Sequence, residues 1–308
     1  MNPELDASVR NAAFGFLNEQ RLIRGGESLP YKVLTEGFLY EGRRVPLMGP
    51  QGIFKPAVLP DMPLSITTVP VVLGRERPYQ DELGADGLLR YRYRGVDPGH
   101  RDNRGLVLAM ERQAPLVYLH GVVPGWYIPA YPVFIVGADP ASLTFTVAVD
   151  QQPNFVARPS GQAFGVEENL VRSYVTRVTM HRIHQHAFRQ RVLLAYQERC
   201  AICSLKHHEL LEASHILPDG DPRGEPVLPN GIALCNLHHA AFDRHVLGIR
   251  PDLTVDLRLD ILHESDGPML RHGLQGFQGA RVSVPRPTHQ QPNREFLEER
   301  YALFRKAS

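Results

Sequence analysis

The chain reads CAIC at residues 200–203, ASHI at 213–216, PNGIALCNLHH at 229–239 and FD at 242–243. All three of its cysteines lie in this stretch, and two residues separate the members of each cysteine or cysteine–histidine pair. Thiolate and imidazole ligands at this spacing favour tetrahedral zinc, and four protein ligands leave no open position for chemistry. The alternative, three buried cysteines and a surface histidine, does not explain two separate pairs. We therefore predict a structural Zn²⁺ bound by Cys200, Cys203, Cys235 and His238.

Length and composition are those of a soluble globular protein with two domains. The 308 residues are 43% hydrophobic and 22% charged. No run approaches the roughly 18 apolar residues of a membrane span, and the first residues lack the layout of a signal peptide, so we expect a cytoplasmic protein with no membrane partner. The formal net charge is only +1, so binding to nucleic acid must come from local basic patches.

Hydrophobic periodicity changes along the chain and suggests its domains. Near-helical spacing predicts helices within residues 1–25, 183–199 and 293–306. Short β-rich runs broken by glycine and proline predict a barrel or curved sheet, with strands at 65–73, 88–93, 116–121, 133–136 and 143–149. We expect an α+β chain with a first domain over 1–160 (core about 30–150), a linker and basic helix over 161–195, a second domain over 196–260, and an extension over 261–308.

The stretch from Cys200 to Asp243 resembles the HNH endonuclease family, whose ββα-metal fold is a β-hairpin and a helix around a catalytic ion. The likeness covers roughly residues 196–255. It implies that His215 is the general base that deprotonates water, a role that suits a neutral imidazole near pH 7. It also implies that Asn230 holds the hairpin and orients His215 by side-chain hydrogen bonds.

The helix that follows the hairpin carries the expected ligands of the catalytic ion. His239 and Asp243 are four residues apart, so on a helix they share one face and can bind one divalent ion, such as Mg²⁺ or Mn²⁺. That ion would polarise the scissile phosphate and stabilise the leaving oxygen. Many family members have Asp or His before the base, where this chain has Ser214, a poor ligand. We therefore expect two side chains on the ion, completed by phosphate and water, so the neighbouring histidines 238 and 239 would bind different metals.

A basic run precedes the metal segment. Residues 172–191 contain five arginines and three histidines but no acidic residue. Such a run would follow the phosphates of DNA and make binding sensitive to salt. The alternative is a solvated cationic face of a helix. The arginines expected on the DNA backbone are Arg172, Arg177, Arg182 and Arg189.

Arginine and tyrosine alternate at residues 90–94 in the first half of the chain. On a strand this alternation places Tyr91 and Tyr93 on one face and the arginines on the other. Tyrosines beside a carboxylate can sandwich an extruded base and bind its Watson–Crick edge. The alternative is an amphipathic strand whose tyrosines pack on a core, and these residues alone do not decide between the two.

Six short motifs occur in a fixed order around that strand: GIFKP at 52–56, SI at 65–66, YQDE at 79–82, YRG at 93–95, DNRGLVLA at 102–109 and PLVYLHG at 115–121. Their succession is similar to the SRA family, a curved, PUA-like barrel that recognises 5-methylcytosine by flipping it out of the duplex. The likeness implies a modified-base pocket formed by Tyr79, Asp81 or Glu82, and Tyr93. The family often has two aspartates where this chain has Asp81 and Glu82, which leaves open which carboxylate meets the base.

Together the two resemblances imply a modification-dependent, type IV-like restriction endonuclease. It would read 5-methylcytosine or 5-hydroxymethylcytosine in duplex DNA and cut with its HNH site. One HNH module nicks one strand, so double-strand cleavage would require a homodimer. Two alternatives stay open: an HNH endonuclease that reads an unmodified sequence or another modification, and a zinc-stabilised DNA-binding protein in which His215 is inert.

Overall fold

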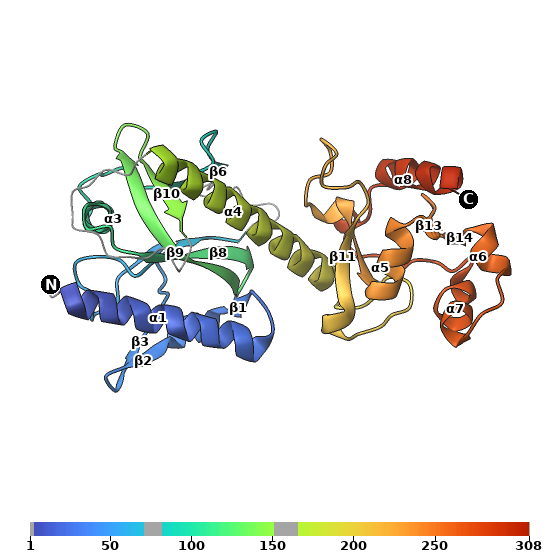
Figure 1. Cartoon of the computed structure of the whole chain (residues 1–308), viewed down its shortest axis with the longest axis horizontal. Coiled ribbons are helices and arrows are strands. Elements are labelled where there is room, and N and C mark those ends of the chain that lie inside the picture. The colour runs from blue at the N-terminus through green and yellow to red at the C-terminus, as the bar shows by residue number, and fades with distance from the viewer. Residues whose placement is uncertain (1–2, 71–81, 151–165, 308) are drawn as a thin grey trace. The chain divides into compact units, whose positions relative to one another are not determined.

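The structure is a computed structural model that describes residues 3–70, 82–150 and 166–307. The chain divides into two compact units, Met1–Ile183 and His184–Ser308 (Figure 1). Each unit has a hydrophobic core of its own. Among the described residues, no helix has the length and apolar character of a membrane-spanning segment.

An eight-stranded sheet curls into a half barrel in the first unit (Figure 1). Its strands follow the order β4-β5-β8-β9-β10-β7-β6, and β1 pairs with β9. Only β5 and β8 run parallel within this sheet of described residues. The strands are β1 (Leu29–Pro30), β4 (Ile53–Phe54), β5 (Ser65–Thr68), β6 (Glu82–Leu83), β7 (Leu89–Arg92), β8 (Leu116–Val123), β9 (Trp126–Asp139) and β10 (Thr144–Val149).

Helix α1 (Pro3–Arg24) confirms the helix predicted for the first 25 residues. Val9, Ala13 and Leu17 recur at helical spacing and are all 0% exposed, so one face of α1 enters the core of the first unit. A small hairpin of β2 (Phe38–Tyr40) and β3 (Arg43–Val45) stands apart from the main sheet. The other helices that begin in this unit are α2 (Tyr31–Glu36), α3 (Arg101–Glu111) and α4 (Val166–Ala195).

The arginine–tyrosine alternation of residues 90–94 is confirmed as an alternation of burial. Tyr91 and Tyr93 are buried, while Arg92 is exposed. The expected strands at 88–93, 116–121 and 143–149 correspond to β7, β8 and β10, and the one at 133–136 is part of the longer β9. The strand expected at 65–73 is shorter in the structure, where β5 ends at Thr68 and Val69 and Pro70 are outside it; residues 71–73 lie outside the described residues.

Asn103 on α3 holds the turn that follows β7. Its buried side chain accepts a hydrogen bond from the Arg94 amide (2.8 Å) and donates to the carbonyl oxygens of Arg94 (3.1 Å) and Asp97 (2.8 Å). Gly95 in this turn has φ 64, a conformation that glycine adopts without strain. The backbone just after β7, next to Tyr93, is therefore held by α3.

The second unit is built around the antiparallel hairpin of β11 (Leu211–His215) and β12 (Gly231–Cys235). Helix α5 (Asn236–Asp243) follows β12 directly, so a β-hairpin and a helix form the predicted ββα arrangement. Gly231 lets the hairpin approach α4, because a Cβ there would lie 2.5 Å from Val192 and 2.8 Å from Phe188. The remaining elements are β13 (Leu247–Ile249), β14 (Val255–Leu257), α6 (Leu259–His263), α7 (Pro268–Gly273), α8 (Arg294–Ala307) and the short 3-10 turns η2 (His208–Leu210), η3 (Leu228–Asn230), η4 (Gln275–Phe277) and η5 (Thr288–Gln290).

Two expected segments differ from the structure. The helix predicted at 183–199 is the second half of α4, which begins at Val166 and ends at Ala195, inside the range 161–195 expected for a linker and basic helix. Residues 261–308 do not form a separate extension, because Leu274, Val282 and Leu297 belong to the same core cluster as the hairpin. The compact second unit is therefore wider than the expected 196–260.

Candidate functional site

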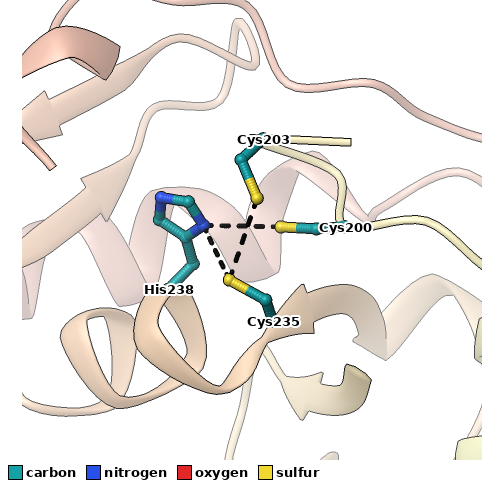
Figure 2. A group of neighbouring side chains, drawn as sticks. All are labelled: Cys200, Cys203, Cys235 and His238. Carbon is teal, nitrogen blue, oxygen red and sulfur yellow. Dashed lines mark hydrogen bonds between the residues drawn. The ribbon is translucent and has the colours of Figure 1, made fainter. Parts of the chain in front are cut away.

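The four predicted zinc ligands converge in the second unit (Figure 2). Cys200 and Cys203 lie in the loop after α4, Cys235 ends β12, and His238 is on α5. Their donor atoms all lie within 4.8 Å of one another. The Nδ1 atom of His238 is 3.1 Å from Cys235 Sγ and 3.4 Å from Cys200 Sγ, and Cys203 Sγ is 3.8 Å from Cys235 Sγ. These separations suit an ion about 2.3 Å from sulfur and about 2.0 Å from nitrogen, so the cluster could hold zinc.

The second ring nitrogen of His238 supports this reading of the cluster. Its Nε2 lies 2.9 Å from the carbonyl oxygen of Gly273, the last residue of α7. A carbonyl accepts only from a protonated nitrogen, so Nε2 carries the hydrogen and Nδ1 is left as the ligand atom. The donor set and its outer contact therefore fit a closed structural zinc site, to which the C-terminal part of the chain contributes.

His215 has the properties that a general base requires. It ends β11 and stacks on Phe188, with 4.2 Å between the ring centroids. Its Nε2 is buried and has no hydrogen-bond partner among the described residues. Burial lowers the pKa of His215 below its usual 6.5; Asp219 and Asp243 oppose this shift, and His239 adds to it. The imidazole is therefore largely neutral at pH 7, the form that accepts a proton.

Asn230 fixes the backbone next to His215 rather than the imidazole itself. It is 0% exposed, and its Oδ1 accepts a hydrogen bond from the Leu217 amide at 2.8 Å. Its Nδ2 donates to the carbonyl oxygens of Leu217 (3.0 Å) and Glu225 (3.2 Å). The hydrogen bonds of Asn230 therefore act on the loop that leaves β11, and a role in orienting His215 stays a prediction.

His239 and Asp243 meet on one face of α5, where His239 Nε2 is 3.1 Å from Asp243 Oδ2. The hydrogen bond to Asp243 raises the pKa of His239. Burial would raise the pKa of Asp243, but His239 and Arg300 outweigh it and the pKa is lowered. Arg300 comes from α8 and donates from Nη2 to Asp243 Oδ1 at 3.3 Å. Sequence reasoning missed Arg300, which is 57 residues from Asp243.

A cavity of about 430 Å³ joins these side chains. His215, His239 and Asp243 line it together with Asp219 and Arg300. Ser214 has no place in its wall, because successive side chains of a strand point to opposite faces and the Ser214 side chain is 0% exposed. The expectation that Ser214 supplies no ligand therefore agrees with its position.

Two of the four arginines expected on the DNA backbone are engaged within the protein. Arg172 pairs with Asp150 at 3.1 Å. Arg189 binds the Glu212 carboxylate at 3.0 Å and the Leu211 carbonyl oxygen at 2.6 Å. Their carboxylate partners lie outside the basic run, so the sequence of the run alone did not reveal them. For Arg172 and Arg189, contact with DNA would therefore compete with these ion pairs.

Arg177 and Arg182 stay exposed on α4. The side chain of Arg182 is 65% exposed, and the carboxylate of Glu27 approaches it only to 4.0 Å. A contact this long and this exposed contributes little. These two arginines remain candidates for contact with phosphates.

The first unit has a cavity of its own, of about 270 Å³, beside the paired tyrosines. Tyr91 and Tyr93 line it with Gly52 and Thr67. Tyr93 is only 2% exposed and stacks on Phe145 with 4.1 Å between ring centroids. Both tyrosines therefore pack against the core and also form part of the cavity wall. Of the other residues expected in a base pocket, Tyr79, Asp81 and the side chain of Glu82 lie outside the described residues.

Basic groups gather beside this cavity around one buried carboxylate. Asp102 is 1% exposed, and Arg94 and Lys55 both pair with it. Burial would raise the pKa of Asp102, but Arg94, Lys55 and His100 outweigh it, so the carboxyl stays ionised. Arg94 also lines the cavity and donates to Gln51 at 2.7 Å. This wall of the cavity therefore carries a surplus of positive charge.

Comparison with known proteins identifies the second unit's site. Residues 200–250 match the family model described as HNH endonuclease. That match contains the hairpin, α5 and the proposed ligands of both metals, and this part of the chain is an HNH endonuclease domain. The match spans a small part of the chain, and the rest is not covered by it.

A solved structure, a "Modification dependent TagI restriction endonuclease", also aligns with the chain. The two are 14% identical over 79% of this chain and 82% of the other, with a TM-score of 0.27. A TM-score this low does not establish a shared fold. No curated protein matches the chain.

Proposed function

We propose that the protein is a modification-dependent DNA endonuclease. Its first unit would bind duplex DNA that carries 5-methylcytosine or 5-hydroxymethylcytosine and flip the modified base, and its HNH domain would hydrolyse the phosphodiester bond. One observation carries the nuclease part of the proposal: His215, with an unpaired Nε2, shares a cavity with His239 and Asp243 inside the HNH match.

His215 acts as the general base in this proposal. Its Nε2 accepts a proton from a water molecule, whose oxygen forms a bond to phosphorus while the bond from phosphorus to the leaving oxygen breaks. Burial keeps the imidazole neutral before the reaction, since it lowers the pKa of His215. Asn230 is a positioning residue, because its three hydrogen bonds hold the loop that leaves His215.

His239 and Asp243 are the residues that would hold a divalent ion. An imidazole and a carboxylate on neighbouring turns of a helix fit Mg²⁺ or Mn²⁺ with open positions left for water and phosphate. When bound, such an ion supplies Lewis-acid polarisation of the phosphate. The Cys3His cluster has no open position, so we assign it to folding rather than to the reaction.

The cavity of the first unit supports the proposal that a flipped base binds there. Its volume of about 270 Å³ exceeds that of a single nucleobase, and two of the wall residues are tyrosines, whose rings can stack on a base. Arg92 and Arg94 also line it and supply positive charge for the flanking phosphates. Exposed Arg177 and Arg182 would add contacts to the DNA backbone.

The burial of Tyr93 favours a second candidate function. A tyrosine that already stacks on Phe145 at 4.1 Å has one ring face occupied, as expected of an amphipathic strand. In that case the first unit would read an unmodified sequence or another modification without flipping a base. In either case one HNH domain cuts one strand, and we propose that a homodimer makes the double-strand break.

Cleavage of three otherwise identical linear DNAs tests the proposal. They would be synthesised with cytosine, 5-methylcytosine or 5-hydroxymethylcytosine throughout, so that any sequence context is present. We expect zinc-loaded wild type to cut at least one modified DNA with Mg²⁺ or Mn²⁺ and to spare the ordinary one. His215→Ala should cut none, while the exposed control His207→Ala should cut as wild type does.

Two outcomes would count against the proposal. Equal cutting of all three DNAs would remove the reading of modified cytosine and favour the second candidate. Failure of the folded, zinc-loaded wild type to cut any of them would remove the nuclease activity and favour a DNA-binding protein.

A further inference from the structure

Arg300 brings a buried cation from α8 to the wall of the nuclease cavity. Its side chain is 11% exposed and lines the cavity of about 430 Å³. Its Nη2 donates to the carbonyl oxygen of Phe242 at 3.2 Å and to Asp243 Oδ1 at 3.3 Å. The guanidinium also lies over the Phe242 ring, 4.8 Å from its centroid. Its Nε is buried and has no hydrogen-bond partner among the described residues.

These contacts offset the burial of Arg300 only in part. A buried ion destabilises the folded protein unless its partners are well placed, and a buried donor without a hydrogen bond adds to this cost. The carboxylate that pairs with Arg300 is shared, because Asp243 also bonds to His239. A guanidinium held at such a cost beside an active site calls for a role other than stability.

Helix α8 does not depend on Arg300 for its attachment. Leu297 and Phe304 of this helix are 0% and 4% exposed. Tyr301 Oη donates to Asp256 at 2.6 Å, and Arg223 forms a two-pronged pair with Glu299 at 2.7 and 2.8 Å. The helix is therefore anchored on both sides of Arg300, and a substitution there should leave it in place.

Arg300 is the cation in the cavity wall that could offset the repulsion between the wall and an anionic phosphodiester. Glu212, Asp219 and Asp243 place three carboxylates in this wall, which would repel a phosphodiester. Arg189 is also in the wall, but it is bound to Glu212 and to a β11 carbonyl oxygen. Arg300 is therefore the arginine of the wall that lies next to Asp243, where the scissile phosphate is proposed to bind.

We propose that Arg300 is a further catalytic residue, which binds a non-bridging oxygen of the scissile phosphate and stabilises the charge that builds on it. This inference rests on the proposed function. A guanidinium is planar and carries several donors, which matches the oxygens of a phosphate. A pre-positioned donor of this kind contributes about 10²–10³ to the rate.

A different role for Arg300, holding Asp243 in place as a metal ligand, predicts the opposite change in ion binding. Loss of a properly held ligand weakens metal affinity by about 10–100-fold. Loss of a cation beside the ion removes a repulsion, so the affinity for a divalent ion should stay equal or increase. The direction of this change separates phosphate binding from ligand positioning.

The test compares full-length, zinc-loaded wild type with Arg300→Gln, Arg300→Lys and the control Arg305→Gln. Arg305 lies on the same helix with its side chain 60% exposed. Mn²⁺ affinity without DNA would be measured by electron paramagnetic resonance, and the cleavage rate of modified DNA at saturating Mn²⁺ by single-turnover kinetics. We expect Arg300→Gln to bind Mn²⁺ at least as tightly as wild type and to cut about 100-fold more slowly. Arg300→Lys should cut about tenfold more slowly than wild type, because lysine keeps the positive charge but lacks the planar set of donors of a guanidinium. Arg305→Gln should cut at the wild-type rate.

Two results would overturn the role of Arg300. One is an unchanged cleavage rate in Arg300→Gln. The other is weaker Mn²⁺ binding by Arg300→Gln with a cleavage rate that additional Mn²⁺ restores, which would make Arg300 a positioning residue. If Arg300→Gln does not fold, the same criteria apply to Arg300→Lys. Failure of the proposed function is distinguishable, because wild type would then cut no DNA although Mn²⁺ binding could still be measured.

Discussion

The nuclease site and the cavity of the first unit differ in how their residues are spread along the chain. His215, Asn230 and His239 come from one hairpin and the helix that follows it, all within residues 200–250. The cavity of the first unit is assembled from three separate segments, at 50–53, 67–69 and 91–94. The difference teaches that the proposed base and metal ligands can be found from local spacing, whereas Arg300 and the cavity proposed to read DNA are assembled by tertiary packing.

The largest expected effect is the loss of the zinc site. Structural zinc contributes about 10–16 kcal/mol of binding free energy that is also folding free energy, so Cys235→Ala should unfold the second unit and leave the first unit folded. Hydrogen exchange read by mass spectrometry would show lost protection in β11, β12 and α5, with β8 and β9 protected as in wild type. Ser204→Ala, in the same loop but outside the cluster, is the control. Native-like protection of the hairpin in Cys235→Ala would contradict the assignment.

Loss of the general base His215 should slow DNA cleavage without weakening DNA binding. His215→Ala lacks the proton acceptor, so we expect cleavage of modified DNA to fall by about 10²–10⁴-fold. Its affinity for the same DNA should stay within about twofold of wild type. Single-turnover cleavage and a gel-shift titration measure the two quantities. A variant that loses DNA binding and cleavage in parallel would show that the two sites are not separable.

The pH dependence of cutting should follow the neutral form of His215. Burial lowers the pKa of His215 below 6.5, with Asp219 and Asp243 opposing and His239 reinforcing the shift. The base is therefore active above this pKa, and the cleavage rate should fall about tenfold for each pH unit below it. Single-turnover rates between pH 5 and 8 at saturating Mn²⁺ give the midpoint. A midpoint clearly above 6.5 would contradict a buried, neutral His215.

The smallest effect is expected from filling the cavity of the first unit. A Cβ on Gly52 would lie 3.1 Å from Tyr91 Oη and 3.4 Å from the Thr67 carbonyl oxygen, both in residues of the cavity wall. Gly52→Val should therefore reduce the preference for modified over ordinary DNA by about tenfold, or about 1.4 kcal/mol, while activity of the HNH site persists. Competition binding measures the preference. Gly15→Ala on α1, where an added Cβ meets nothing within 4 Å, is the control. An unchanged preference for modified DNA in Gly52→Val would show that this cavity does not bind the modified base.

Local spacing explains what could be predicted from the sequence. The two pairs that contain Cys200 and Cys235 could be assigned together because ligands two residues apart reach one ion. His239 and Asp243 could be paired because residues four apart share a helix face. The strand β7 was predicted from the alternation of arginine and tyrosine, and the burial of Tyr91 and of Tyr93, the residue after β7, confirms the alternation.

Contacts between distant segments could not be predicted in this way. Arg300 reaches the site only because α8 packs beside α5, and nothing near it in the sequence marks it. The ion pairs of Arg172 and Arg189 were missed for the same reason, because the fold brings their partners Asp150 and Glu212 to them. Long-range electrostatic pairing depends on tertiary packing, and a local count of charges does not contain it.

The central claim is that reading lies in the first unit and cutting in the HNH domain. The most direct measurement is the affinity of full-length, zinc-loaded His215→Ala for three duplexes of one sequence, with 5-methylcytosine, 5-hydroxymethylcytosine or cytosine throughout. Competition binding at fixed salt gives the affinity ratios without cleavage. We predict that at least one modified duplex binds at least about tenfold more tightly than the cytosine duplex, a difference of about 1.4 kcal/mol. Equal affinity for all three duplexes would contradict the claim.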